Sequence, residues 1–140
     1  MKKIILLVLI GVVFMLSSEN AKESHARSNN FIEASIGQVY NLDLLDKDTL
    51  NYVVRKFAHF SIYFVIGLTT FWYISDKKIK NQKQLFLSLF LLFLFALFDE
   101  VHQIYTGRSF SYKDILIDFS GGLLAIVIYY QFKKRSKILG

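Results

Sequence analysis

The chain has 140 residues, of which 54% are hydrophobic and 16% aromatic, and its mean hydropathy is +0.38. A soluble chain of this length needs a polar surface, so this composition excludes an ordinary soluble domain. It predicts an integral membrane protein with a single domain, residues 1–140. The absence of cysteine excludes disulfides and thiolate chemistry, and the absence of proline excludes proline kinks in the helices.

The first apolar segment is Ile4–Leu16, which follows Lys2 and Lys3. It predicts a membrane helix over about residues 4–20, although a short apolar run behind lysines is also typical of a cleaved signal peptide. The nearest small-x-small triplet, residues 24–26, lies well past the apolar run. We therefore expect the helix to be retained, with cleavage as the alternative.

Residues 17–51 form a polar stretch. Its first half is rich in Ser and Asn and predicts a loop. Its second half predicts a short amphipathic helix on the membrane surface, because apolar residues recur there at helical spacing. These residues are Ile32, Ile36, Val39, Leu42 and Leu45.

Three further apolar segments follow: Phe57–Ser75, Leu85–Phe98 and residues 115–130. A helix that crosses the hydrocarbon core needs about 20 residues. The first of the three meets this length alone, whereas the other two need polar neighbours to reach it. The predicted fold is therefore an all-α, four-transmembrane-helix bundle, with helices over about residues 4–20, 53–75, 84–104 and 112–132.

The charges predict the orientation of these helices. If both termini are cytoplasmic, the inner segments hold ten cations and one acid, and the outer segments hold seven cations and ten acids. Cytoplasmic loops of membrane proteins carry such an excess of Lys and Arg. The net charge of +6 therefore indicates a multi-pass protein of the cell membrane and no nucleic-acid partner.

Ionisable residues gather at the outer ends of three predicted helices. Arg55, His59 and Tyr63 are spaced i, i+4 and i+8 on the second helix, and Asp114 and Asp118 are one turn apart on the fourth. We expect Asp118 to face His59 and the Asp99–Glu100 end of the third helix. The candidate catalytic residues are His59, Asp99, Glu100, Asp114 and Asp118, and the candidate substrate-binding residues are Arg55, Lys56, Tyr63, Gln103 and Arg108.

Asp118 is the most costly of these residues to place. A carboxylate this far inside a membrane helix costs roughly 2 to 3 kcal/mol unless it is paired or hydrated. Arg108, Lys113 or Lys56 could supply the opposite charge. Gly121 and Gly122 follow Asp118, and such small residues allow neighbouring helices to approach closely.

The chemistry of the cluster is underdetermined by its composition. Carboxylates beside a histidine permit proton transfer or coordination of a divalent ion, and nearby cations can hold a phosphate or a carboxylate. The same charges could instead be ion pairs that hold the helices together. No catalytic triad order, zinc-binding HExxH or phosphate-binding loop is present, so the sequence specifies neither a cofactor nor a metal.

Three motifs resemble the VanZ-like family, small bacterial membrane proteins named for a member linked to teicoplanin resistance. They are K-x-x-H with a following tyrosine, D-E-x-x-Q, and R-x5-D-x3-D-x3-G, and together with the first helix the resemblance covers nearly the whole chain. They comprise Lys56, His59, Tyr63, Asp99, Glu100, Gln103, Arg108, Asp114, Asp118 and Gly122. The chain departs from the pattern at Thr106-Gly107, where a proline often precedes the arginine.

The resemblance implies a role at the cell surface and, in some members, lowered sensitivity to lipoglycopeptide antibiotics. It implies no mechanism, and the oligomeric state stays open. Together with the cluster, it favours a protein that binds or modifies a membrane lipid or a lipid-linked envelope component at the outer face. The alternative is a non-catalytic scaffold or surface-shielding protein whose charges only hold its helices together.

Overall fold

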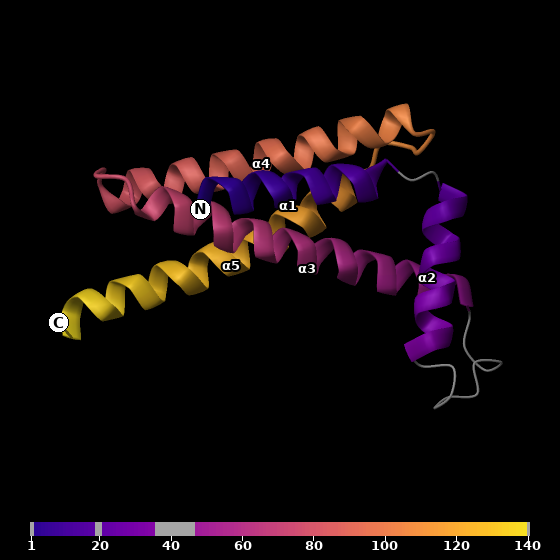
Figure 1. The fold of residues 1–140 in the computed structure, drawn as a ribbon, viewed down its shortest axis with the longest axis horizontal. Coiled ribbons are helices and arrows are strands. Elements are labelled where there is room, and N and C mark those ends of the chain that lie inside the picture. Colours follow the sequence, from indigo (N-terminus) through magenta and orange to yellow (C-terminus); the bar gives the residue numbers. More distant parts are fainter. Residues whose placement is uncertain (1, 19–20, 36–46, 140) are drawn as a thin grey trace.

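The computed structural model describes residues 2–18, 21–35 and 47–139, and its regular structure in these ranges is entirely helical. The helices are α1 (Lys2–Ser17), α2 (Ala21–Ser35), α3 (Lys47–Ser75), α4 (Asn81–Tyr105) and α5 (Tyr112–Leu139). α1, α3, α4 and α5 run along one bundle, and α2 crosses its end at a steep angle (Figure 1). The predicted all-α fold is confirmed for the described residues.

Three helices in the described ranges are long and apolar enough to cross a membrane: Asp48–Ser75, Asn81–Tyr105 and Tyr112–Arg135. They correspond to the second, third and fourth predicted helices, and each is longer than predicted. α1 has 16 residues, which is just below the roughly 17 residues that a spanning helix needs. The structure thus contains three helices of spanning length, and α1 packs beside α3 and α4.

The prediction of a loop in the first half of the polar stretch is wrong, because α2 occupies residues 21–35. Tertiary contacts explain why a segment with so many Ser and Asn residues is helical. Ile32 is buried, and the Asn51 side-chain amide of α3 donates a 2.6 Å hydrogen bond to Asn29 Oδ1 of α2. The amphipathic helix predicted over Ile32–Leu45 falls mostly on residues 36–46, which lie outside the described residues.

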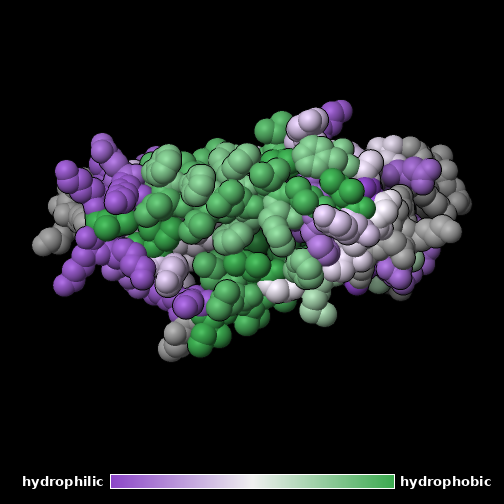
Figure 2. All heavy atoms as spheres, turned by 90° about the horizontal axis from the view of Figure 1, so that it is seen from above, coloured by the Kyte–Doolittle hydropathy of each residue, from purple (hydrophilic) through white to green (hydrophobic). Residues whose placement is uncertain are grey.

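Large apolar side chains cover the outside of the bundle. Ile4, Met15, Phe86, Phe98 and Phe132 are all more than half exposed. Figure 2 shows a hydrophobic band around the middle of the molecule, between two hydrophilic ends. Such a band is unfavourable in water and favourable in hydrocarbon, as expected for membrane-crossing helices.

Glycines bring α3 and α5 into backbone contact. A Cβ atom added at Gly67 would overlap the backbone of Gly122, and one added at Gly121 would overlap the carbonyl oxygen of Phe60. Small residues permit such close packing of membrane helices, as predicted for Gly121 and Gly122. Gly122 lies one turn after Asp118, so this contact fixes the spacing of the two helices next to the candidate site.

The two termini lie at the same end of the bundle, together with the α3–α4 turn (Figure 1). Lys2 Nζ forms a 2.6 Å ion pair with Asp76 of this turn and lies 4.4 Å above the ring of Trp72. These contacts join the start of α1 to the end of α3.

Gln84 provides a hydrogen-bond donor for backbone carbonyl groups at that same end of the bundle. Its side-chain amide faces the carbonyl oxygens of Ser75, Lys77 and Ile79, at 3.4, 2.9 and 3.2 Å. Lys133 of α5 donates to Gln84 Oε1 and to the Ser75 carbonyl, at 2.9 and 3.0 Å. The last carbonyls of a helix have no partner within the helix, so this network stabilises the C-terminal end of α3.

Candidate functional site

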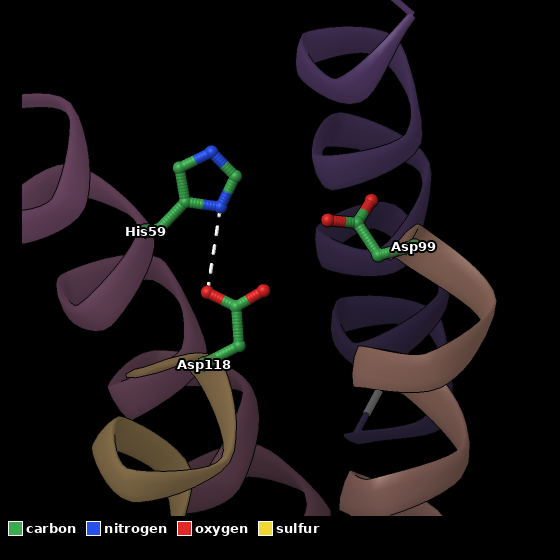
Figure 3. Close-up of side chains that lie close together, drawn as sticks. All are labelled: His59, Asp99 and Asp118. Carbon is green, nitrogen blue, oxygen red and sulfur yellow. Dashed lines mark ion pairs between the residues drawn. The ribbon is translucent and has the colours of Figure 1, made fainter. Parts of the chain in front are cut away.

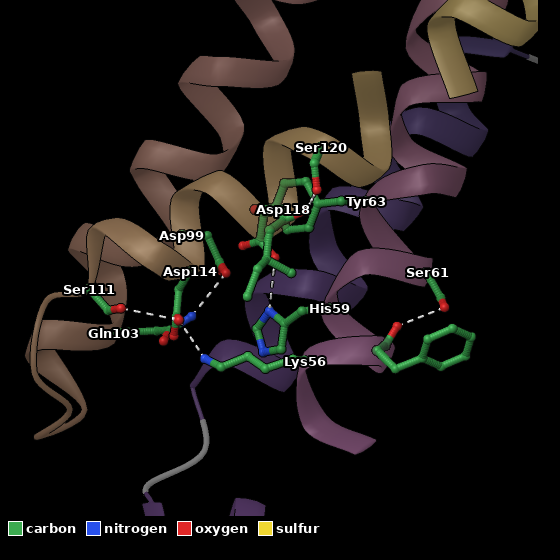
Figure 4. A network of polar contacts seen from close by, with 12 residues as sticks. Lys56, His59, Ser61, Tyr63, Asp99, Gln103, Ser111, Asp114, Asp118 and Ser120 are labelled. Atoms are coloured by element: carbon green, nitrogen blue, oxygen red, sulfur yellow. Dashed lines mark hydrogen bonds and ion pairs between the residues drawn. The ribbon is translucent and has the colours of Figure 1, made fainter. Parts of the chain in front are cut away.

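The predicted site residues lie at the opposite end of the bundle from the termini. Three helices contribute most of them, and Figure 4 shows several of their side chains converging, among them His59, Asp99 and Asp118. Lys56, His59 and Tyr63 come from α3, Asp99, Glu100 and Gln103 from α4, and Asp114 and Asp118 from α5. The expected meeting of three helices at one depth is therefore present in the structure.

His59, Asp99 and Asp118 form the centre of this cluster (Figure 3). The Nδ1 atom of His59 lies 3.4 Å from Oδ1 of Asp118, and one potential ligand atom from each of the three residues lies within 4.8 Å of the others. Both carboxylates are buried, Asp118 with 1% of its surface exposed and Asp99 with 4%. The expectation that Asp118 faces His59 and the end of α4 is confirmed.

The carboxylate of Asp99 is oriented by its neighbours. Gln103, one turn later on α4, donates a 3.0 Å hydrogen bond to Asp99 Oδ2. The buried hydroxyl of Ser17, at the end of α1, lies beside the same carboxylate. α1 thus contributes a polar group to the cluster, which the sequence did not indicate because Ser17 lies more than eighty residues away from Asp99.

Lys56 and Asp114 form a separate ion pair in the cluster. Lys56 Nζ donates to Asp114 Oδ1 at 2.5 Å, and Ser111 Oγ donates to the same oxygen at 3.1 Å. The side chains of Lys56 and Asp114 are only 14% and 13% exposed. The suggestion that Lys56 neutralises Asp118 is therefore wrong. Lys56 pairs instead with Asp114, which lies one turn closer to the start of α5.

Glu100 positions the start of α5. The backbone N–H of Ser111 donates a 2.6 Å hydrogen bond to Glu100 Oε1, and the carboxylate is buried with 1% of the residue exposed. Its other oxygen, Oε2, accepts no hydrogen bond within the described part of the chain. Glu100 therefore links the end of α4 to the start of α5 through Oε1, whereas Oε2 is not used in this link.

Tyr63 and Arg55 of α3 differ in their burial and in their contacts. Tyr63 is buried, and its hydroxyl donates a 3.2 Å hydrogen bond to the carbonyl oxygen of Phe95 on α4. Arg55 is half-buried, and its Nε atom has no hydrogen-bond partner among the described residues. Its electrostatic neighbours include Arg108 and Asp114. Arg108 also lies within electrostatic range of Asp99 and Glu100.

Comparison of the sequence with models of known protein families identifies the family of the chain. The model of the VanZ/LLP1 family matches residues 3–133, which is nearly the whole length. The chain belongs to the VanZ/LLP1 family. With its three long apolar helices it is a membrane protein of that family. A search among curated proteins and another among solved structures gave no significant match.

This VanZ/LLP1 protein has a glycine turn at Thr106-Gly107, where its sequence lacks the proline that often precedes the arginine in the family. Gly107 has a φ of +79°, which is a left-handed conformation that glycine adopts at little cost. The N–H groups of Gly107 and Arg108 donate to the carbonyls of Ile104 and Gln103, at 3.1 Å each. This pattern is a Schellman motif, so a glycine C-cap ends α4 and positions Arg108 without a proline.

A groove of about 600 Å³ separates α2 from α3 in this VanZ/LLP1 protein and reaches the edge of the cluster. Its lining is mainly apolar, with Phe31 of α2 facing residues of α3 such as Val53 and Phe57. The polar lining comes from Arg27, Ser28, Arg55, His59 and Ser61.

Arg27 and Phe31 were missing from the predicted site. Periodicity could not reveal them, because the sequence indicated a loop where α2 places both side chains toward α3. The site in the described residues therefore consists of a buried His/Asp centre, a Lys56–Asp114 pair and a cationic, apolar groove that meets the centre at His59.

Proposed function

We propose that this VanZ/LLP1 protein binds and modifies a lipid-linked, phosphate- or carboxylate-bearing envelope component at the outer face of the cytoplasmic membrane. The groove between α2 and α3 carries the proposal, because it combines an apolar wall with Arg27 and Arg55 and ends at His59. An acyl or prenyl chain would lie along the apolar wall. Its anionic head would contact the arginines, whose planar guanidinium groups suit phosphate and carboxylate.

The orientation in this proposal rests on charge. The end that holds both termini and the α3–α4 turn is rich in lysine, whereas the acids concentrate at the end that holds the cluster. α1 then crosses the membrane as a fourth span despite its short length, with Lys2 at the cytoplasmic surface beside Asp76. The cluster and the groove face outward under this arrangement.

Reporter fusions test the topology. A reporter that is active only outside the cytoplasm is expected to work after Arg108 and to stay silent after Lys80 or Gly140. The physical reason is the excess of lysine on the two silent segments, which resists translocation. Activity after Lys80 would reverse the orientation and contradict the placement of the cluster at the outer face.

Lipid binding tests the groove directly. In detergent, the full chain is expected to bind a polyprenyl phosphate at least tenfold more tightly than the corresponding polyprenol, which lacks the charge. Arg55→Gln should remove most of this difference, since a charge-assisted hydrogen bond contributes about 1.5 to 3 kcal/mol. Ala58→Trp should weaken both ligands by filling the apolar wall, on which Ala58 lies.

Arg135→Gln is the matched control, because Arg135 lies at the end of the last candidate span, away from the groove. It should bind both ligands as the unaltered chain does. Equal binding of phosphate and alcohol by the unaltered chain would contradict a head-group site.

We further expect deletion of the protein to raise teicoplanin sensitivity in its host, with restoration by the unaltered chain and not by Arg55→Gln.

The alternative function is a scaffold without chemistry, and the buried Lys56–Asp114 pair favours it for those two residues. Glu100→Gln separates the two functions, because glutamine can still accept the hydrogen bond from Ser111. A scaffold in which Glu100 only joins helices should keep its effect on sensitivity whenever Glu100→Gln accumulates normally in the membrane. Loss of effect at normal abundance supports the proposed chemistry.

A further inference from the structure

His59, Asp99 and Asp118 present donor atoms of metal-binding type from three different helices. One imidazole nitrogen and two carboxylate oxygens lie within 4.8 Å of one another, and Figure 3 shows both carboxylates directed toward the space beside the imidazole ring. Imidazole and carboxylate together suit divalent ions such as Zn²⁺, for which His, Asp and Glu are common ligands alongside Cys.

The distances between these donor atoms fit an ion with short metal–ligand bonds. Two ligands of a tetrahedral Zn²⁺ with bonds of about 2.1 Å are about 3.4 Å apart. The His59 Nδ1 to Asp118 Oδ1 distance is 3.4 Å, which matches this edge. The remaining contraction is at most about 1.4 Å for any pair of the three atoms, which side-chain rotation can supply.

Burial and bonding also indicate a missing partner. Asp118 is almost fully buried, and its Oδ1 atom accepts no hydrogen bond in the described part of the chain. This atom is directed toward the imidazole of His59 (Figure 3). The two atoms are 3.4 Å apart, and His59 does not complete a hydrogen bond to this oxygen. A buried carboxylate oxygen without a hydrogen bond is costly, so it calls for a proton or a cation.

The neighbouring lysines and arginines of the described residues do not supply that charge by direct contact. Lys56 is engaged with Asp114, and within the described ranges no lysine or arginine forms an ion pair with Asp99 or Asp118. Two buried carboxylates this close repel each other when both are ionised. A divalent ion would neutralise both at once and would use the imidazole as a neutral ligand.

The surroundings of Asp99 resemble the outer shell of a metal site. Gln103 Nε2 donates to Asp99 Oδ2 at 3.0 Å, and the Ser17 hydroxyl lies beside the same carboxylate. Outer-shell hydrogen bonds of this kind fix the orientation of carboxylate ligands. Gln103 is itself buried, so its orientation is restricted by packing.

We propose that His59, Asp99 and Asp118 bind one divalent transition-metal ion, with Zn²⁺ as the best match, and leave a fourth coordination position open. Three protein ligands with one open position are the arrangement of catalytic zinc sites, whereas structural zinc sites are closed by four. The open position would accept water or an oxygen of a ligand that reaches His59 from the groove. The site stands whether or not the groove binds a lipid.

Metal content after loading tests this proposal. The full chain, purified in detergent through a tag without histidine, is stripped with chelator, loaded with Zn²⁺ alone and desalted. We expect about one zinc per chain, and a Co²⁺-loaded sample with visible absorption bands of a low-symmetry, four-coordinate ion. His59→Gln and Asp118→Asn should each bind Zn²⁺ at least a hundredfold more weakly, and Gln103→Leu 10- to 100-fold more weakly.

Glu100→Gln is the near control. This variant replaces a buried carboxyl group next to Asp99 by an amide, and Glu100 lies outside the three-residue set, so the variant should keep one zinc per chain. Equal zinc in the unaltered chain and in Asp118→Asn would overturn the proposal. If Asp118→Asn does not fold, failure of the stripped, folded, unaltered chain to take up zinc would overturn it. One zinc per chain without polyprenyl phosphate binding would retain the metal site and reject the lipid function.

Discussion

Gly67→Ala is expected to destabilise the protein by about 3 kcal/mol, the upper part of the range for overpacked cores. The added Cβ would overlap three backbone atoms of Gly122, and backbone inside a helix cannot rotate away as a side chain can. α3 and α5 must then separate, which also moves His59 away from Asp118. The measurement is thermal unfolding in detergent together with the amount of protein in the membrane.

Two other glycines calibrate this expectation. Gly11→Ala is the matched control, because a Cβ at Gly11 meets nothing within 4 Å and alanine favours the helix. Gly122→Ala should fall between the two, since the three atoms nearest to its Cβ would belong to the side chain of Leu92 and not to backbone. Equal stability of Gly67→Ala and Gly11→Ala would show that α3 and α5 are not in backbone contact.

Breaking the Lys56–Asp114 pair from either side is expected to cost about 3 to 5 kcal/mol, because the remaining charge stays buried without a partner. Lys56→Met and Asp114→Leu together should recover much of this loss, since no charge is then left. A double-mutant cycle on unfolding free energies measures the coupling between the two side chains.

Lys2 and Asp76 provide the control ion pair in the same chain. Their side chains are 26% and 58% exposed, compared with 14% and 13% for Lys56 and Asp114. The same cycle on the exposed pair should give a coupling of at most about 1 kcal/mol, and added salt should weaken it. Similar coupling in both pairs would contradict the buried character of the Lys56–Asp114 contact.

Local pattern predicted most of the helices and the members of the cluster. Uncharged runs such as Leu85–Phe98 fix the hydrophobic length, and i, i+4 spacing placed Asp114 and Asp118 on one face of α5. Both inferences depend only on helical periodicity, which acts between residues close in sequence.

Features that depend on contacts between residues far apart in the sequence could not be predicted. α2 is helical in the context of contacts such as Asn29–Asn51, and the hydrogen bond between these side chains joins residues 22 positions apart. Asp114 and Asp118 lie on one face of α5, so the choice of Asp114 as the partner of Lys56 depends on the position of α5 along its axis relative to α3. Gly67 has no distinguishing neighbours in the sequence of its long apolar helix, and its importance depends on the contact with Gly122, 55 positions later.

Trp72, which lies beneath Lys2, is the only tryptophan in the chain. All indole fluorescence of the protein therefore originates at the joint between the start of α1 and the end of α3. An unlabelled sample reports on that joint: detachment of α1 removes the ammonium group above the ring and changes the emission. Events confined to the His59 end of the bundle leave this emission unchanged, so a shift on adding zinc or lipid would reveal motion transmitted along the helices.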